Sequence, residues 1–492
     1  MNAKSIVKMG CTTMAGAMAM TSCTGAKAQE AKGGEKSPNV IFIIADDLGI
    51  GDVTPYGQKL IKTPNLERMA QEGMKFTQCY SGTAVSAPSR ASLVTGLHTG
   101  HTHIRGNLKA SETGDPEGQA PMPDGTYTIA QMFKNAGYST GCFGKWGLGY
   151  PGSESDPTKV GFDHFMGYNC QTLAHDYYPD HLWSDTTRIE LTDNYNQAES
   201  TYSADMIHSK AMDFIREKGK SGEPFFAFLT YTLPHAELVL PHDSVYQEYC
   251  RIIPEADDKA WAEDNPNKRG AYGATERPLA SFASMVTRLD SYVGDVLNEL
   301  KELGIDDNTL VIFTSDNGPH REGGANPDYF SSYGPYRGIK RDLYEGGIRM
   351  PFIARYPGKI KAGSVNDHVF AFWDMMPTFA SLAGSTDTIT TDGISIVPTL
   401  MGDEGQRTHP YLYWEFHEQG GKQAVRMGDW KGVRLNVSDP SKTTFELYDL
   451  ANDVHEDNNV AAQHPDVVAR INEIMDTAHT HSSLFNFENK ER

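Results

Sequence analysis

Short apolar runs alternate with amphipathic stretches along most of this chain. Strands are predicted at 40–45, 75–80, 139–143, 225–231 and 309–314. Most of these segments are continuous apolar runs, which is typical of strands that are covered on both faces. Residues 282–300 place apolar side chains at helical spacing along one face. This alternation predicts an α/β fold with a large, mostly parallel sheet flanked by helices.

Two shorter helices are marked by the residues at their ends. Thr63-Pro64 is a helix start, and the pattern stops near Gly73. Thr128 and Gln131 have the spacing of a capping box for a helix that stops at Gly137.

The pattern changes near residue 385. Short alternating stretches at 424–430 and 444–448 predict an antiparallel sheet, and a helix is expected at 465–478. We therefore predict a catalytic domain at 38–385 and a smaller C-terminal domain at 386–492, an antiparallel sheet with a helix.

The first residues read as an export signal. Lys4 and Lys8 precede an apolar run at 9–20 that is too short to span a bilayer. Cys23 is a candidate for a lipid anchor, and a small-residue cleavage pattern ends at Ala28. We predict a signal at 1–28, a polar linker at 29–37, a periplasmic location and no transmembrane segment.

The charge balance limits the class of partner. The 492 residues carry a formal net charge of −20, and removing residues 1–28, which hold three lysines and no acid, leaves −23. Bulk electrostatics of this sign exclude a nucleic-acid binder. An anionic substrate would need local cations that act against the overall field.

Polar residues follow four of the predicted strands at the point where each strand ends. Ligands of open α/β sheets bind beyond the carboxyl ends of the strands, so these residues predict one shared site. The residues are Asp46, Asp47, Lys145, His235, Asp316 and Asn317.

The acidic members of this set offer oxygen ligands alone. Asp46, Asp47, Asp316 and Asn317 suit Ca²⁺ or, less well, Mg²⁺, whereas zinc prefers His and Cys. Taken singly, Asp-Asp and Asp-Asn-Gly are more often solvated turns. Two such turns at one sheet edge favour a metal site.

The segment Ser86-Ala87-Pro88-Ser89-Arg90 supplies a hydroxyl beside a helix start. Pro88 suits the first turn of a helix, which places Ser86 just outside the N-terminus, where an anion is favoured. Arg90 lies one turn further on and can fold back to the same place. The alternative is an ordinary strand-to-helix turn with a capping serine.

Several motifs occur together in a fixed order. They are Asp46-Asp47, Ser86 to Arg90, Gly144-Lys145-Trp146, Pro234-His235, Ser315 to Gly318, Lys340 to Gly347, Asp374 to Thr378 and Glu446 to Leu450. On these motifs, from roughly residue 38 to the end, the chain resembles the type I, formylglycine-dependent sulfatases of the alkaline phosphatase superfamily. The resemblance implies an alkaline phosphatase-like fold and hydrolysis of sulfate esters.

The resemblance also implies a role for each motif residue. Ser86 would be the modified residue, converted to Cα-formylglycine, whose hydrate attacks sulfur. Asp46, Asp47, Asp316, Asn317 and the modified Ser86 would hold Ca²⁺. Arg90, Lys145 and Lys340 would neutralise the sulfate. Asp316 would take the proton of the nucleophile, and His235 with Lys340 would protonate or stabilise the leaving alcohol.

Two positions depart from the commonest pattern of this family. Serine stands at position 86 where many relatives have cysteine, which implies an anaerobic, serine-type sulfatase-maturing enzyme as a partner. Gly147 stands where many relatives have a histidine that assists release of sulfate. His103 is a candidate substitute for that base, against the alternative of a substrate or packing contact.

The expected substrate is a sulfated galactose or N-acetylgalactosamine residue of a glycan. Residues 171–179 are rich in aromatic, His and Asp side chains and resemble a segment in carbohydrate sulfatases whose histidine, here His175, reads an axial galactose hydroxyl. A tyrosine-rich packing loop is the alternative. Further candidates for substrate contacts are His103, Arg105, Asn107, Glu415 and His417.

Rival functions are a phosphatase or phosphodiesterase of the same superfamily and an inactive protein that binds sulfated glycans.

Overall fold

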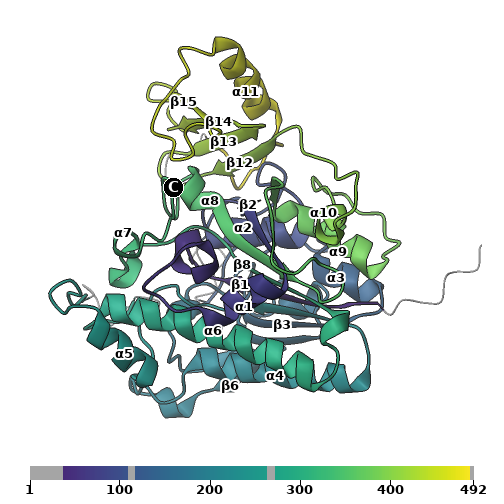
Figure 1. Cartoon of the computed structure of the whole chain (residues 1–492), viewed down its shortest axis with the longest axis vertical. Coiled ribbons are helices and arrows are strands. Elements are labelled where there is room, and N and C mark those ends of the chain that lie inside the picture. Colours follow the sequence, from purple (N-terminus) through teal and green to yellow (C-terminus); the bar gives the residue numbers. More distant parts are fainter. Residues whose placement is uncertain (1–36, 109–116, 263–271, 488–492) are drawn as a thin grey trace, which may run out of the picture. The chain divides into compact units, whose positions relative to one another are not determined.

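The computed structural model describes residues 37–108, 117–262 and 272–487 (Figure 1). The predicted signal at 1–28, with Cys23, lies outside the described residues, as does the linker up to residue 36. Among the helices of the described part, none combines the length and apolar character that crossing a membrane requires.

A mixed, mostly parallel sheet of eleven strands forms the centre of the described chain, with the order β10-β2-β9-β8-β1-β7-β3-β4-β5-β6 and β11 paired with β2. β1 is parallel to both β7 and β8, and β3 is parallel to β7 and β4. β9 runs antiparallel to β2 and β8. The strands are β1 (Asn39–Ala45), β2 (Met74–Tyr80), β3 (Ser139–Lys145), β4 (His164–Tyr168), β5 (His181–Ser184), β6 (Thr187–Glu190), β7 (Phe225–Thr230), β8 (Thr309–Ser315), β9 (Arg349–Arg355), β10 (Ser364–Asn366) and β11 (Phe370–Ala371).

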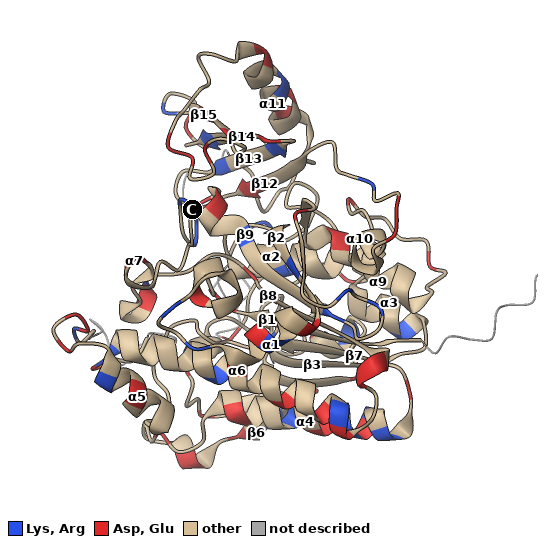
Figure 2. Cartoon of the chain, viewed as in Figure 1, with Lys and Arg blue, Asp and Glu red and all other residues tan. Residues whose placement is uncertain are grey.

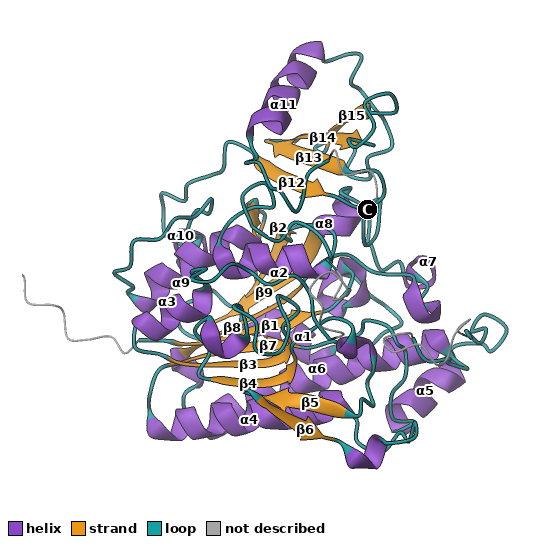
Figure 3. Cartoon of the chain, turned by 180° about the vertical axis from the view of Figure 1, so that it is seen from behind, coloured by secondary structure: helices purple, strands orange, loops and turns teal. Residues whose placement is uncertain are grey.

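Helices cover both faces of this sheet (Figure 3). Side chains of β1 alternate between two cores: Ile41 and Ile43 pack with α1, α4 and α6, whereas Phe42 and Ile44 pack with α2, α3 and α9. The helices are α1 (Pro64–Glu72), α2 (Ser86–Thr95), α3 (Ile129–Asn135), α4 (Ser203–Ser221), α5 (Ser244–Ile252), α6 (Pro278–Glu302), α7 (Pro327–Phe330), α8 (Glu345–Ile348), α9 (Met375–Ala383), α10 (Val397–Met401) and α11 (Pro465–Thr477). Burial on both faces explains why β1 reads as an unbroken apolar run.

A smaller antiparallel sheet follows in the C-terminal part. Its four strands are β12 (Leu412–Phe416), β13 (Lys422–Met427), β14 (Trp430–Leu435) and β15 (Thr444–Asp449), paired in chain order. α11 packs on this sheet through Ile471, Ile474 and Met475. The predicted α/β class and the smaller antiparallel sheet with a helix are both confirmed.

Local details differ from the sequence pattern at two helix starts. α2 begins at Ser86 itself, with Val85 as its N-cap, so the serine lies inside the first turn rather than before it. Thr128 caps α3 by accepting from the backbone N–H of Gln131. The Gln131 side chain does not return to the Thr128 backbone, because its Nε2 donates to Asn135 Oδ1 at 2.7 Å. One of the two hydrogen bonds of the expected capping box therefore forms.

Charged residues of both signs are interspersed along α4 (Figure 2). Three buried cations, Arg90, Lys145 and Lys340, contact the aspartates that follow β1 and β8 at the carboxyl ends of these strands. That is where the candidate site lies.

Candidate active site

Ser86 meets the first metal-ligand candidates at the start of α2. Its side chain is buried, and its Oγ donates to Asp46 Oδ1 at 2.9 Å. The same Oγ lies 3.4 Å from Asn317 Oδ1. Since Asp46 follows β1 and Asn317 follows β8, the parallel pairing of these strands brings the two turns together. The site thus joins three segments that are distant in the sequence.

Arg90 is buried one turn after Ser86 and holds the end of β8. Its Nε donates to Asp316 Oδ2 at 2.9 Å, and its Nη1 donates to the carbonyl oxygen of Lys145 at 2.8 Å. Its Nη2 lies 3.9 Å from Asp46 Oδ2. The guanidinium therefore links the ends of β1, β3 and β8.

Two lysines face the paired aspartates that follow β1. Lys145 Nζ donates to Asp46 Oδ2 at 2.6 Å, and Lys340 Nζ donates to Asp47 Oδ2 at 2.7 Å. Burial raises the pKa of both carboxyl groups, but the neighbouring cations outweigh it and leave both pKa values below the ordinary value. Both aspartates are therefore ionised, each with an ammonium group beside it.

Backbone conformation at two positions makes this approach possible. Asp47 has a φ of 61°, a left-handed conformation that aspartate tolerates better than most residues. Gly144, just before Lys145, has a φ of 130°, and a Cβ there would lie 2.0 Å from the Thr230 carbonyl oxygen. Only glycine permits β3 to end this close to β7.

Asp316 differs from the other two aspartates. Burial, followed by the negative charge of Asp46, raises its pKa to about 7 in spite of Arg90. Its Oδ1 accepts from the backbone N–H of Asp47 at 3.1 Å. A carboxyl group with such a pKa can exchange a proton near neutral pH.

His235 lies on the Lys340 side of the site. Its Nε2 is 3.2 Å from Lys340 Nζ and 3.3 Å from Asp47 Oδ2. Burial, then the charge of Lys340, lowers its pKa to about 3. The sequence suggested a general acid near neutral pH, whereas in this arrangement the ring is neutral at pH 7 and faces the lysine that can donate to it.

The predicted substrate residue His175 does reach this place. It ends a 3₁₀ turn, η5 (Leu173–His175), and its ring lies parallel to that of His235 at 5.2 Å. Tyr272 is tilted against both rings, at 5.0 Å from His175 and 6.0 Å from His235. An aromatic wall therefore stands beside the group assigned to the leaving alcohol.

Arg105, Glu415 and His417 lie elsewhere, in a buried polar cluster. Arg105 Nη1 donates to Glu415 Oε1 at 3.0 Å, and the remaining donors of this arginine reach Thr102 and Thr480. His417 Nε2 lies 2.9 Å from the same Glu415 oxygen. These contacts tie the segment after α2 to β12 and pair the Arg105 donors with protein oxygens.

His103 and Asn107 are not joined to the Ser86 cluster by any contact among the described residues. His103 is exposed and lines a separate cavity of about 390 Å³, which also touches Ala91 and Thr95 of α2. Asn107 is half-buried, and its Oδ1 has no hydrogen-bond partner in the described chain. The structure therefore gives no support to His103 as the missing base.

The space beside Gly147 is filled by two amide side chains. A Cβ at Gly147 would lie 3.5 Å from Gln171 Nε2 and 3.6 Å from Gln119 Oε1. Both amide atoms are buried without a hydrogen-bond partner among the described residues. Gly147 also has a φ of 74°, which disfavours any residue with a side chain.

Sequence reasoning missed a second layer around Lys340. Glu322 lies 3.7 Å from Lys340 Nζ and 2.5 Å from Arg341 Nη1. His320 stacks against His235 at 5.6 Å and lies 3.5 Å from Glu322. Glu322 follows the Asp-Asn-Gly motif by four residues and Arg341 lies within the Lys340 to Gly347 motif, and this proximity to the motifs was the available signal.

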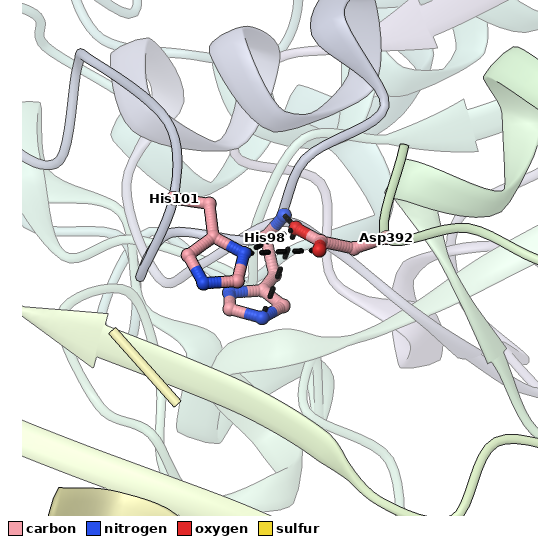
Figure 4. A group of neighbouring side chains, drawn as sticks. All are labelled: His98, His101 and Asp392. Atoms are coloured by element: carbon pink, nitrogen blue, oxygen red, sulfur yellow. Dashed lines mark hydrogen bonds and ion pairs between the residues drawn. The ribbon is translucent and has the colours of Figure 1, made fainter. Parts of the chain in front are cut away.

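A further histidine–carboxylate cluster lies beyond the other end of α2 (Figure 4). His101 Nδ1 lies 2.9 Å from Asp392 Oδ1, and His98 Nε2 lies 3.7 Å from Asp392 Oδ2. The two imidazole rings are stacked at 4.2 Å with a 27° angle, so one ion cannot lie in the plane of both. His98 Nδ1 also accepts from the N–H of Gly100, which leaves the proton on Nε2. The cluster therefore fastens residue 392 to the segment after α2.

Comparison with known proteins gives two family matches. Residues 38–385 match the family described as Sulfatase, and residues 336–481 match N-sulphoglucosamine sulphohydrolase, C-terminal. The chain is 30% identical to the N-acetylgalactosamine-6-sulfatase of Canis lupus familiaris over 422 residues, covering 82% of this chain and 72% of that protein. It is 27% identical to the N-acetylgalactosamine-6-O-sulfatase of Bacteroides thetaiotaomicron, covering 94% of this chain and 97% of that protein.

Solved structures give the same grouping. A sulfatase structure from work on glycosaminoglycan metabolism by Bacteroides thetaiotaomicron has a TM-score of 0.71 at 26% identity and covers 90% of this chain and 99% of that chain. The crystal structure of Ps i-CgsB in complex with k-i-k-neocarrahexaose has a TM-score of 0.72 at 26% identity, with 90% and 93% covered.

Proposed function

Because this chain belongs to the sulfatase family and is a sulfuric ester hydrolase, we propose that it removes sulfate from carbohydrates with Ser86 as its modified nucleophile. The observation that carries the proposal is the place of the Ser86 hydroxyl. It is buried at the start of a helix, 2.9 Å from Asp46, within a cluster that holds three cations. Conversion of Ser86 to Cα-formylglycine supplies the hydrated aldehyde as nucleophile.

The donor atoms fit a hard divalent cation. Asp46, Asp47, Asp316 and Asn317 present oxygens around Ser86, and oxygen ligands favour Ca²⁺, or less well Mg²⁺, over zinc. These residues would hold Ca²⁺, which supplies positive charge for the nucleophile and the sulfate. The three carboxylates already face three cations, so a bound dication leaves a positive site for an anionic ester.

The residues of the chain divide the remaining work. Arg90 and Lys145 hold the sulfate oxygens from the side of β3, and Lys340 holds them from the opposite side. Asp316 accepts the proton of the nucleophile. His235 and Lys340 stand on the leaving side, where Lys340 donates to the departing oxygen and neutral His235 orients the ammonium group.

The proposed substrate carries its sulfate on galactose or N-acetylgalactosamine. His175 and Tyr272 form a wall beside His235, and an imidazole with an aromatic face suits a sugar ring and its hydroxyl groups. Relatives named N-acetylgalactosamine-6-sulfatase in both dog and Bacteroides thetaiotaomicron support this choice. An N-acetylglucosamine-6-O-sulfatase of the same bacterium is also similar, at 27% identity. 6-Sulfated N-acetylglucosamine is therefore the comparison substrate, and its sulfate should be released more slowly than that of 6-sulfated N-acetylgalactosamine.

Export to the periplasm and maturation by a serine-type, anaerobic sulfatase-maturing enzyme complete the proposal. The N-terminal charge and apolar pattern supports export, and serine at position 86 supports that class of maturase. Cys23 remains the proposed lipid anchor.

Mass spectrometry of the peptide that contains Ser86 tests the proposal. Protein made together with the maturase should lose two hydrogens, about two mass units, at Ser86, and release of sulfate from 6-sulfated N-acetylgalactosamine should rise with the converted fraction. Ser86→Ala is the matched control and should release none. Hydrolysis by unconverted protein, or faster release of phosphate than of sulfate from matched aryl esters, would contradict it. Converted protein that binds but never cleaves sulfated glycans would favour the binding-protein alternative.

A further inference from the structure

Glu237 is a buried carboxyl group that the proposed reaction does not use. It lies two residues after His235 and is 7% exposed. Each of its oxygens accepts one backbone N–H: Oε1 from Tyr177 at 3.0 Å and Oε2 from Gly273 at 2.7 Å. The carboxyl group thus holds two chain segments that are about a hundred residues apart in sequence.

These two segments carry the aromatic wall of the site. His175 lies two residues before Tyr177, and Tyr272 immediately precedes Gly273. The backbone N–H of Glu237 also donates to the His175 carbonyl oxygen at 3.4 Å. The contacts of Glu237 therefore set where both rings stand relative to His235.

The two segments depend on Glu237 to different degrees. Tyr177 has a second anchor, because its hydroxyl donates to the carbonyl oxygens of Thr232 and His235 at 2.8 and 3.1 Å. On the other side, the backbone pairing nearest to Tyr272 among the described residues is the bridge between Thr275 and Trp261. Loss of the carboxyl group should therefore displace Tyr272 more than His175.

The close approach at Gly273 leaves no room for a Cβ unless the Glu237 carboxyl group moves. A Cβ on this residue would lie 2.5 Å from Glu237 Oε2 and 3.3 Å from Val239 Cγ2. An alanine would therefore push the carboxyl group away from its backbone partner. The contact can be broken from either of its two sides.

We propose that Glu237 is a positioning residue for substrate specificity, which fixes His175 and Tyr272 around His235 so that they receive the sugar that carries the sulfate. This inference rests on the proposed function. It assigns Glu237 no contact with the reacting atoms. Its effect should therefore depend on the size of the substrate.

Two substrates distinguish an effect on the aromatic wall of His175 and Tyr272 from an effect on the sulfate-binding residues. A 6-sulfated N-acetylgalactosamine oligosaccharide needs both, whereas 4-nitrophenyl sulfate presents a flat ring and no sugar hydroxyl. In matured protein, Glu237→Met removes both acceptors at similar length, and Glu237→Gln keeps one. We expect kcat/KM for the glycan to fall between about 10-fold and 100-fold in Glu237→Met, mainly through KM. The kcat/KM of Glu237→Gln for the glycan should lie between those of Glu237→Met and the wild type. Turnover of the aryl sulfate should change less than about threefold in both variants.

Asp290 provides a matched control. It is also a buried carboxylate that accepts two backbone N–H groups, those of Asn65 and Leu66 at 3.0 and 2.7 Å, at the start of α1. Asp290→Asn should lower the melting temperature while leaving the ratio of glycan to aryl sulfate activity unchanged. Gly273→Ala, which attacks the same contact from its other side, should reproduce the substrate-dependent loss.

The outcomes decide between a positioning role and a structural one. Equal losses on both substrates in Glu237→Met and Gly273→Ala, or no loss on the glycan, would overturn the inference. If Glu237→Met does not fold, Gly273→Ala and Glu237→Gln decide by the same ratio. Wild-type protein that carries formylglycine and releases sulfate from neither substrate would overturn the proposed function itself, and the inference with it. Wild-type activity on both substrates together with an unchanged ratio in the variants would overturn the inference alone.

Discussion

Arg90 Nε donates to Asp316 Oδ2 at 2.9 Å, and both side chains are buried. The pair joins the first turns of α2 to the end of β8, so it holds the nucleophile position beside the metal-ligand candidates. Removing one member of a buried pair leaves the other charge without compensation, which costs about 3–5 kcal/mol. This pair therefore couples the stability of the protein to the geometry of its site.

Arg90→Ala should lower both stability and turnover. We expect the free energy of unfolding to fall by about 3–5 kcal/mol and kcat to fall by at least about 100-fold, because the anion loses a donor. Thermal unfolding and sulfate release measure the two effects. Arg470→Ala is the control: its ion pair with Glu473 is exposed on both sides, so its loss should cost at most about 1 kcal/mol and leave activity unchanged. Normal turnover in Arg90→Ala would contradict the assignment.

Removal of divalent metal should destabilise the wild-type protein and stop its activity. Dialysis against a chelator removes the ion that the oxygen cluster around Asp46 is proposed to hold, and a ligand present at 100 times its Kd contributes about 2.7 kcal/mol. Differential scanning calorimetry should show a lower Tm, restored better by Ca²⁺ than by Mg²⁺. Asp46→Asn should lose most of this response. A Tm that is the same before and after dialysis against the chelator would argue against a resident metal.

Asp52 should make stability depend on pH. Burial raises its pKa from 3.8 to about 7, although its Oδ2 accepts from the Gly49 N–H at 2.8 Å. Between these two pH values the unfolded chain has lost the proton that the folded chain retains. The free energy of unfolding therefore falls as pH rises from about 4 to 7, by up to about 4 kcal/mol at 1.36 kcal/mol per unit.

Asp52→Asn checks this assignment. The amide stays neutral at every pH, so Tm measured from pH 4 to 7 should fall less steeply than in the wild type. An unchanged slope would mean that other groups cause the dependence.

Arg105→Met should separate a packing role from a substrate role. The variant leaves Glu415 buried without its ion pair to Arg105, so we expect a loss of about 3–5 kcal/mol in the free energy of unfolding. KM for the sulfated glycan should stay within about twofold, because every donor of Arg105 that forms a hydrogen bond reaches protein oxygens. A raised KM at unchanged Tm would restore Arg105 as a substrate contact.

Gly147→His should reduce activity rather than restore a base. A side chain at a φ of 74° costs about 1–2 kcal/mol in a left-handed backbone, and this one would also displace Gln171. Gly137→His is the control, because Gly137 has a φ of 87° and the backbone cost is similar, but a Cβ there meets no atom within 4 Å. This variant should lose stability without losing turnover. Higher turnover in Gly147→His would show that the pocket still accepts the histidine.

Much of the site could be read from the sequence because it is built from strand ends. Asp46 and Asp316 directly follow buried strands, Lys145 ends one and His235 comes shortly after another. Parallel pairing brings such ends to one edge of a sheet. Contacts that depend on side-chain direction could not be read in this way. His175 was the first candidate for the substrate and Arg105 a weaker one, but the sequence did not show that Arg105 is enclosed by Glu415 and Thr480 whereas His175 stacks on His235.

The sequence by itself determined the fold class, the order of the motifs and the residue types around Ser86, because hydrophobic periodicity and local motifs are properties of neighbouring residues. The tertiary structure alone decided that His235 is neutral beside Lys340, that amides fill the space at Gly147 and that Glu237 joins two distant loops. Burial and charge at a site come from groups far apart in the chain. Their effect exists only after folding has removed water and placed those groups within a few ångströms of one another.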